Sequence, residues 1–259
     1  QRGTIIADQT TFYGTMGGQQ GDKGTIHSAN GEFKVEETIH LQGGKIGHVG
    51  VMTKGMLSVG ETVTLSVCPK NRALTSKNHS ATHLLQKALR TVLGSHVEQA
   101  GSYVDAGRLR FDFTHFEALT PEQISAIEQL ANEEIMKAVS MHIYETSLDE
   151  ARASGVMALF GEKYGEKVRV VEAGEFSREL CGGCHVGNTA EIGFLKILGE
   201  SSIGSNTRRI EAVTSYGALE YVNSIERELK AAAFELKAPL FEVSQRAAAN
   251  LKALKELQH

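Results

Sequence analysis

Residues 1–70 alternate short apolar, often β-branched runs with glycines, a pattern typical of strands joined by tight turns. In residues 60–67, GETVTLSV, apolar positions recur at every second residue, so these side chains share one face of a strand. The dipeptide Gly43-Gly44 separates two such runs and predicts a hairpin turn. Because no helical period interrupts these strands, we expect residues 1–70 to form a small N-terminal β-barrel.

After residue 70 the spacing of apolar residues alternates between helical and strand periods. One predicted helix carries an apolar stripe at Leu84, Leu85, Ala88, Leu89 and Val92. Asn78 is its expected N-cap and Gly94 its expected stop. Capping boxes at Thr120 and Ser147 predict two further helices. Strands are predicted at residues 107–113, 167–173, 192–198 and 207–214. We therefore expect an α+β domain over residues 71–215.

The last segment, residues 216–259, is helical and charged. Its apolar residues keep a helical spacing up to Pro239, which separates two helical runs. Neither run has an obvious core of its own. We expect a helical linker or the start of a coiled coil.

The composition is that of an ordinary globular protein, with 41% hydrophobic and 22% charged residues. No apolar run approaches the ~18–20 residues of a membrane span. The chain opens with QRGTIIADQT, which has neither an initiator Met nor a signal peptide, so we expect a piece of a longer cytoplasmic protein. The net charge of −4 argues against a broadly basic nucleic-acid surface but allows a local basic strip.

The stretch ELCGGCHVG, residues 179–187, contains two of the three cysteines, Cys181 and Cys184, followed by His185. Three interpretations compete: attachment of a c-type haem, a redox dithiol, or half of a metal site. The first requires export, which no signal indicates. The second usually lies at a helix N-terminus, whereas the residues that follow resemble a turn and then a strand.

A second pair of potential ligands favours the metal site. His79 and His83 are four residues apart on a predicted helix, so both imidazoles leave the same face. Cys181 and His185 repeat this interval across two glycines that allow a tight bend. Three imidazoles and one thiolate form a donor set that zinc favours.

The zinc could be structural or catalytic. Four protein ligands close a tetrahedron and favour a structural role. The hydroxyl groups of Ser80 and Thr82 beside the ligands favour a functional role. So does the glycine-rich, basic stretch downstream, in which Arg208 and Arg209 are candidates for phosphate contacts.

Several stretches together resemble the editing domain of alanyl-tRNA synthetases: NHSATHLL, LRFDF, MALFGEKYG, ELCGGCHVG and RRIEAVT. The N-terminal stretch DQTTFYGTMGGQQGDKG resembles the β-barrel segment before that domain, and the tail resembles the helical linker after it. The resemblance covers nearly the whole chain. It implies zinc-dependent hydrolysis of tRNA(Ala) mischarged with serine, and of the glycine ester as a second candidate.

The family pattern assigns the zinc ligands to His79, His83, Cys181 and His185. It associates Gln99 with editing, and hydroxyl groups, carried over to Ser80 and Thr82, with recognition of serine. Cys184 departs from the family, which usually has Thr there. No residue is indicated as the catalytic base.

The resemblance also leaves alternatives and implies partners. A free-standing AlaX-type deacylase or a non-catalytic zinc-stabilised tRNA-binding module remains open. Nothing resembles the ATP-using aminoacylation domain, which we expect, with a C-terminal domain, in the full-length protein. The expected partner is the mischarged 3′ end of tRNA(Ala), with no membrane involved.

Overall fold

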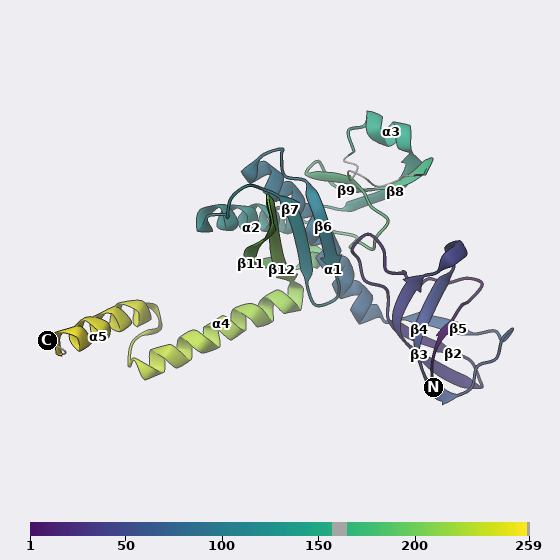
Figure 1. Ribbon diagram of the computed structural model, residues 1–259, viewed down its shortest axis with the longest axis horizontal. Coiled ribbons are helices and arrows are strands. Elements are labelled where there is room, and N and C mark those ends of the chain that lie inside the picture. The colour runs from purple at the N-terminus through teal and green to yellow at the C-terminus, as the bar shows by residue number, and fades with distance from the viewer. Residues whose placement is uncertain (157–164, 258–259) are drawn as a thin grey trace. The chain divides into compact units, whose positions relative to one another are not determined.

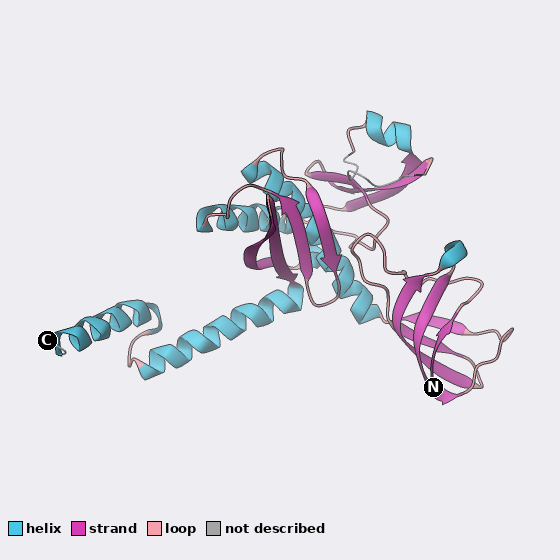
Figure 2. Cartoon of the chain, viewed as in Figure 1, coloured by secondary structure: helices cyan, strands magenta, loops and turns pink. Residues whose placement is uncertain are grey.

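The computed structural model describes residues 1–156 and 165–257 (Figure 1). Most of the stretch MALFGEKYG, residues 157–165, therefore lies outside the described residues. The chain divides into two compact units, Gln1–Ser215 and Tyr216–His259. All strand ladders in the described part are antiparallel and helices pack beside them, so the fold is α+β, as the sequence predicts (Figure 2).

The N-terminal segment forms a five-stranded sheet in the order β1-β4-β3-β2-β5. Its strands are β1 (Arg2–Ile5), β2 (Gly24–His27), β3 (Gly31–His40), β4 (Ile46–Gly55) and β5 (Thr64–Val67). The hairpin at Gly43-Gly44 is confirmed: both glycines have positive φ, in a turn between β3 and β4. No ladder pairs β1 with β5 within residues 1–70, so hydrogen bonding does not show the expected closed barrel.

Helix α1 (Pro69–Leu93) begins well before the expected cap. Pro69 occupies the first turn, where a missing N–H costs little. The prediction of Asn78 as N-cap is therefore wrong. Asn78 lies inside the helix, where its side chain donates to Asp105 O and accepts from Thr214 Oγ1. Gly94 ends the helix, as predicted, with a φ of 118°.

A four-stranded sheet in the order β11-β12-β7-β6 packs with α1 and α2 (Pro121–Met136) around the main core. Its strands are β6 (Gln99–Val104), β7 (Leu109–Thr114), β11 (Leu195–Gly204) and β12 (Thr207–Thr214). The capping box at Thr120 is confirmed by reciprocal bonds with Gln123. Fully buried aromatic and aliphatic residues such as Phe111, Phe113 and Leu85 fill the space between sheet and helices.

A smaller three-stranded sheet, β10-β9-β8, carries the second half of the candidate site. It consists of β8 (Met141–Ser147), β9 (Lys167–Ala173) and β10 (Ser177–Leu180), and α3 (Leu148–Ala153) follows β8. The capping box at Ser147 is also confirmed. Because β10 ends at Leu180, it delivers Cys181 directly into the loop that follows. A single 3-10 turn, η2 (Thr189–Ile192), precedes β11.

The second unit contains α4 (Ser215–Glu235), a short turn η3 (Leu240–Glu242) and α5 (Val243–Leu257). Its apolar residues with helical spacing, Leu219, Val222, Ile225 and Leu229, are between 36% and 49% exposed. No helix in the described ranges is long and apolar enough to cross a bilayer.

Candidate metal centre and adjoining pocket

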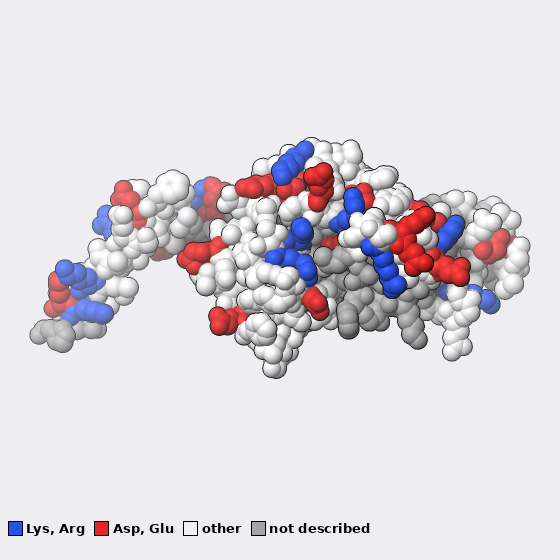
Figure 3. All heavy atoms as spheres, turned by 90° about the horizontal axis from the view of Figure 1, so that it is seen from above, with Lys and Arg blue, Asp and Glu red and all other residues white. Residues whose placement is uncertain are grey.

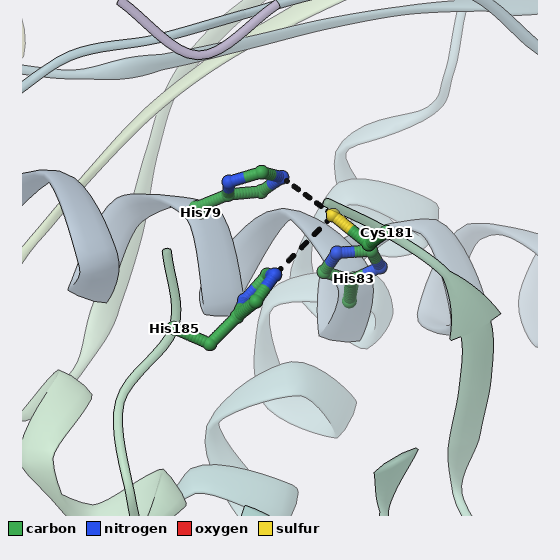
Figure 4. A group of neighbouring side chains, drawn as sticks. All are labelled: His79, His83, Cys181 and His185. Carbon is green, nitrogen blue, oxygen red and sulfur yellow. Dashed lines mark hydrogen bonds between the residues drawn. The ribbon is translucent and has the colours of Figure 1, made fainter. Parts of the chain in front are cut away.

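Four side chains from two distant parts of the sequence meet at one point. His79 and His83 extend from α1, and Cys181 and His185 from the loop after β10 (Figure 4). One ligand atom from each lies within 4.8 Å of all the others. The Cys181 Sγ lies 3.4 Å from His79 Nε2 and 3.3 Å from His185 Nε2. The structure thus brings together all four residues that the sequence singles out as ligands.

Hydrogen bonds between Arg169 and backbone groups hold the loop that carries Cys181 and His185. Arg169 on β9 donates from Nη1 to the carbonyls of Cys181 and Gly183, at 2.9 and 2.7 Å. The Cys181 N–H in turn donates to the Arg169 carbonyl. This reciprocal bonding fixes the turn that aims both ligands at α1.

Each histidine has an outer hydrogen-bond partner at Nδ1. His79 Nδ1 lies 2.7 Å from Gln19 Oε1, and His83 Nδ1 lies 2.5 Å from Glu179 Oε2. His185 Nδ1 lies 3.1 Å from Ser80 Oγ. With Nδ1 engaged in every case, each ring can turn Nε2 and its lone pair toward the centre of the cluster.

The electrostatics of the cluster suit a cation. Burial raises the pKa of the Cys181 thiol, but His79 and hydrogen bonds from the surrounding imidazoles hold that pKa well below its ordinary value, so a thiolate is favoured. Burial lowers the pKa of His185 to about 3, which keeps it neutral. Burial also lowers the pKa of His83, but Glu179 and Cys181 outweigh burial and raise it.

A metal ion fits this arrangement on two observations. The donor set of three imidazole nitrogens and one thiolate sulfur is one that zinc favours. His83 Nε2 is buried and has no hydrogen-bond partner among the described residues, so a ligand bond would satisfy it. The other cysteine of the region, Cys184, does not belong to the cluster. Burial raises the pKa of the Cys184 thiol, which favours its protonated form.

A pocket of about 400 Å³ opens onto the cluster. His79, His83 and Cys181 all line it, so the candidate metal centre is accessible from this space. Two cationic side chains, Lys167 and Arg169, lie on its wall. The pocket therefore combines apolar surface with two cationic side chains and the Glu179 carboxylate, and it is large enough for the end of a substrate.

The three predicted substrate-binding residues differ in position. Thr82 and Gln99 line the pocket. The Thr82 hydroxyl donates to the Asn78 carbonyl and keeps its oxygen lone pairs as acceptors. Ser80 does not line the pocket. Its oxygen accepts from the Val186 N–H at 3.1 Å and contacts His185.

The predicted phosphate-binding residues are engaged in ion pairs. Arg209 donates two bonds to Asp112, at 2.7 and 2.8 Å, and Arg208 pairs with Glu200. Neither arginine lines the pocket. On the face shown in Figure 3, acidic and basic side chains are interspersed, in keeping with the net charge of −4.

Sequence reasoning missed several residues of the site. Glu179 lies two positions before Cys181 along the same extended segment, so the strand period of two could have indicated that both face one side. Lys167 and Arg169 share one face of the predicted strand 167–173, but only the tertiary structure places that face on the pocket. Gln19 gave no local signal, because only a tertiary contact brings it to His79.

Two family models match the chain. The one described as "Threonyl and Alanyl tRNA synthetase second additional domain" matches residues 168–211, which include Cys181 and His185. The one described as "tRNA synthetases class II (A)" matches residues 1–70, which form the five-stranded sheet.

Curated relatives match over nearly the whole chain. Alanine–tRNA ligase 1 of Lachnoclostridium phytofermentans is 58% identical over 90% of this chain and 26% of its own length. The alanine–tRNA ligase of Pelotomaculum thermopropionicum is 49% identical over 98% of this chain and 29% of its own length. The alanine–tRNA ligase of Pseudomonas fluorescens is 52% identical over 92% of this chain and 27% of its own length. The chain belongs to the alanyl-tRNA synthetase family and spans between a quarter and a third of the length of these relatives.

Proposed function

We propose that this chain is the proofreading part of an alanyl-tRNA synthetase and hydrolyses the ester of Ser-tRNA(Ala), with Gly-tRNA(Ala) as a second candidate substrate. The observation that carries the proposal is the opening of the His79, His83 and Cys181 cluster onto a pocket of about 400 Å³. A purely structural zinc site has no need of such access.

A separate proofreading site is useful because a pocket that binds alanine discriminates poorly against amino acids of similar size. A pocket built for alanine discriminates against glycine or serine by only ~1–3 kcal/mol. A site with polar groups that must meet the serine hydroxyl rejects alanine, because alanine would leave those groups unpaired. We assign this role to Thr82 and Gln99, which line the pocket.

Zinc in the cluster would supply Lewis-acid chemistry, either activating water or orienting a polar group of the substrate. The chain's own residues hold the ligands and orient their rings through the Nδ1 hydrogen bonds. Ser80 fits a positioning role for His185, since its hydroxyl lies between that ring and the Val186 N–H.

Among the residues that the structure describes, no buried carboxylate near the ligands is free to act as a general base. Both oxygens of Glu179 are engaged, one by His83 and the other by Ser177 Oγ. Asp112 is engaged by Arg209. The labile aminoacyl ester therefore depends on positioning and on the water near the ligands.

The partner of this site is the mischarged 3′ end of tRNA(Ala). Lys167 and Arg169 on the pocket wall suit the phosphates of that end. Arg208 and Arg209 remain candidates for more distant tRNA contacts, reached by exchange of their present ion pairs. In the full-length protein we expect an ATP-using aminoacylation domain and a C-terminal domain in addition.

The test is deacylation of Ser-tRNA(Ala) beside Ala-tRNA(Ala), with the chain and its Cys181→Ala variant at measured zinc content. Loss of the serine ester alone, abolished in a folded variant, supports serine-selective editing. No hydrolysis by the zinc-loaded chain, even at high protein concentration, would instead favour a non-catalytic zinc-stabilised tRNA-binding module. A free-standing AlaX-type deacylase would show the same activity, but in a protein whose native gene encodes no aminoacylation domain.

A further inference from the structure

A glycine-rich segment of the N-terminal region, residues 17–20, inserts beside the four-stranded sheet. The Gln20 N–H donates to the Val104 carbonyl, and the Val104 N–H donates to the Gly18 carbonyl, both at 2.8 Å. Gly18 has a φ of +85°, and a Cβ there would lie 2.7 Å from the Ser102 carbonyl oxygen. Only glycine allows this close approach, which drives the next side chain, Gln19, into the interior.

Gln19 is 0% exposed, and its amide oxygen joins the two halves of the metal centre. Oε1 accepts from the Cys184 backbone N–H at 2.8 Å. The same oxygen lies 2.7 Å from His79 Nδ1. One side chain from the N-terminal region thus contacts both the ligand helix and the ligand loop.

The donors and acceptors in this contact determine one another. A backbone N–H can only donate, so the group of Gln19 that faces Cys184 must be the oxygen and not the amide nitrogen. The Gln19 oxygen can only accept, so His79 Nδ1 must carry a proton to bond with it. In its neutral form, His79 therefore presents an unprotonated Nε2 toward Cys181 and the cluster.

We propose that Gln19 is a positioning residue that fixes the tautomer of His79 and makes the N-terminal region part of the metal centre. The inference rests on the proposed metal site. Gln19 Nε2 is buried and has no partner among the described residues, an arrangement that costs free energy. An apolar side chain at position 19 would avoid that cost. The presence of Gln19 is therefore explained by its oxygen, which bonds both His79 and the Cys184 N–H.

The neighbouring Gln20 provides a matched control. It lies in the same segment and is only half-buried, and it lines a different pocket from the one beside the cluster. Gln19→Met and Gln20→Met remove the same amide from adjacent positions and keep a side chain of similar length. Gln19→Glu keeps an acceptor next to His79.

The experiment measures zinc affinity of the whole chain by competition with a chromophoric chelator, and the visible absorption of the cobalt-substituted protein. We expect Gln19→Met to bind zinc ~10–100-fold more weakly and to alter the cobalt spectrum. Gln20→Met should match the unmodified chain, and Gln19→Glu should recover most of the lost affinity. Equal affinity of Gln19→Met and Gln20→Met, or no recovery in Gln19→Glu, would overturn the inference.

A double-mutant cycle with His79→Ala separates positioning from general damage to the fold. If Gln19 acts through His79, Gln19→Met should cost little further affinity once His79 is absent. Fully additive losses would overturn the inference. Zinc binding needs no tRNA, so absence of zinc binding by the unmodified chain would count against the proposed function, whereas normal binding by Gln19→Met would count only against Gln19.

Discussion

Gly183 lies against the imidazole of His79 so closely that a Cβ on it would be 2.1 Å from Cε1 and 2.4 Å from Nδ1. That added Cβ on Gly183 would also lie 2.7 Å from Gln19 Oε1. The second glycine of the Cys-Gly-Gly-Cys-His stretch thus makes room for a ligand ring from α1. At adjacent Gly182, a Cβ would meet only Met16 Cε among the described residues, at 3.8 Å.

Gly183→Ala should therefore displace His79 or its loop and weaken zinc binding, whereas Gly182→Ala should not. The two variants make the same chemical change one residue apart, so loop stiffening alone would affect both. Zinc affinity by chelator competition measures the difference. Equal affinities of the two variants would show that the loop relaxes without disturbing His79.

Glu179→Ala should weaken zinc binding ~10–100-fold, because His83 would lose the carboxylate that orients its ring. Glu179→Gln should weaken it less, since the amide oxygen still accepts from Nδ1. Exposed Glu175→Ala, in the turn before β10, controls for loss of one negative charge. Unchanged affinity in Glu179→Ala would mean that packing alone holds His83.

Lys167→Ala should reduce affinity for tRNA without affecting zinc binding, because Lys167 lines the pocket but contacts no ligand. If its ammonium group contacts one phosphate, the slope of log affinity against log salt should fall by about one. Lys45→Ala, an exposed lysine after the β3–β4 turn, is the control. Measuring tRNA affinity by filter binding or anisotropy at several salt concentrations tests this. An unchanged slope would remove Lys167 from the tRNA interface.

Arg209→Ala should lower the thermal midpoint of the chain, because it leaves the buried Asp112 carboxylate without its two-bond partner. Arg108→Ala should change the midpoint little, since the Arg108–Glu211 pair is exposed. Thermal unfolding of both variants gives the comparison. An unchanged midpoint together with weaker tRNA binding would assign Arg209 to the tRNA interface.

His48 should make the N-terminal sheet less stable in mild acid. Burial lowers its pKa, and its ring bonds Ile5 O and Thr10 Oγ1 in the neutral form. Because the folded-state pKa lies below the unfolded value of about 6.5, the unfolded chain takes up the proton first as the pH falls. Its contribution to stability is therefore complete above pH ~6.5 and decreases below it, toward the lowered folded-state pKa.

Denaturant unfolding between pH 7 and pH 5 tests this, followed through the N-terminal sheet by hydrogen exchange. His48→Gln should flatten the dependence in that window, whereas His27→Gln, an exposed histidine of β2, should leave it unchanged. If His48→Gln keeps the full slope, other groups are responsible for the acid sensitivity.

The sequence alone determined the features that depend on local spacing. The interval of four residues placed His79 and His83 on one face of a helix, and the same interval across two glycines paired Cys181 with His185. The capping boxes at Thr120 and Ser147 are also local, because each closes within three residues.

Only the tertiary structure decided which distant groups complete the site. Asn78 looked like a cap because its type favours helix ends, but its contacts with Asp105 and Thr214 hold it within α1. Gln19 lies 60 positions from His79, and Glu179 lies 96 positions from His83. No periodicity in a sequence encodes contacts over such distances. They arise when sheet and helix faces pack and every buried donor and acceptor must find a partner.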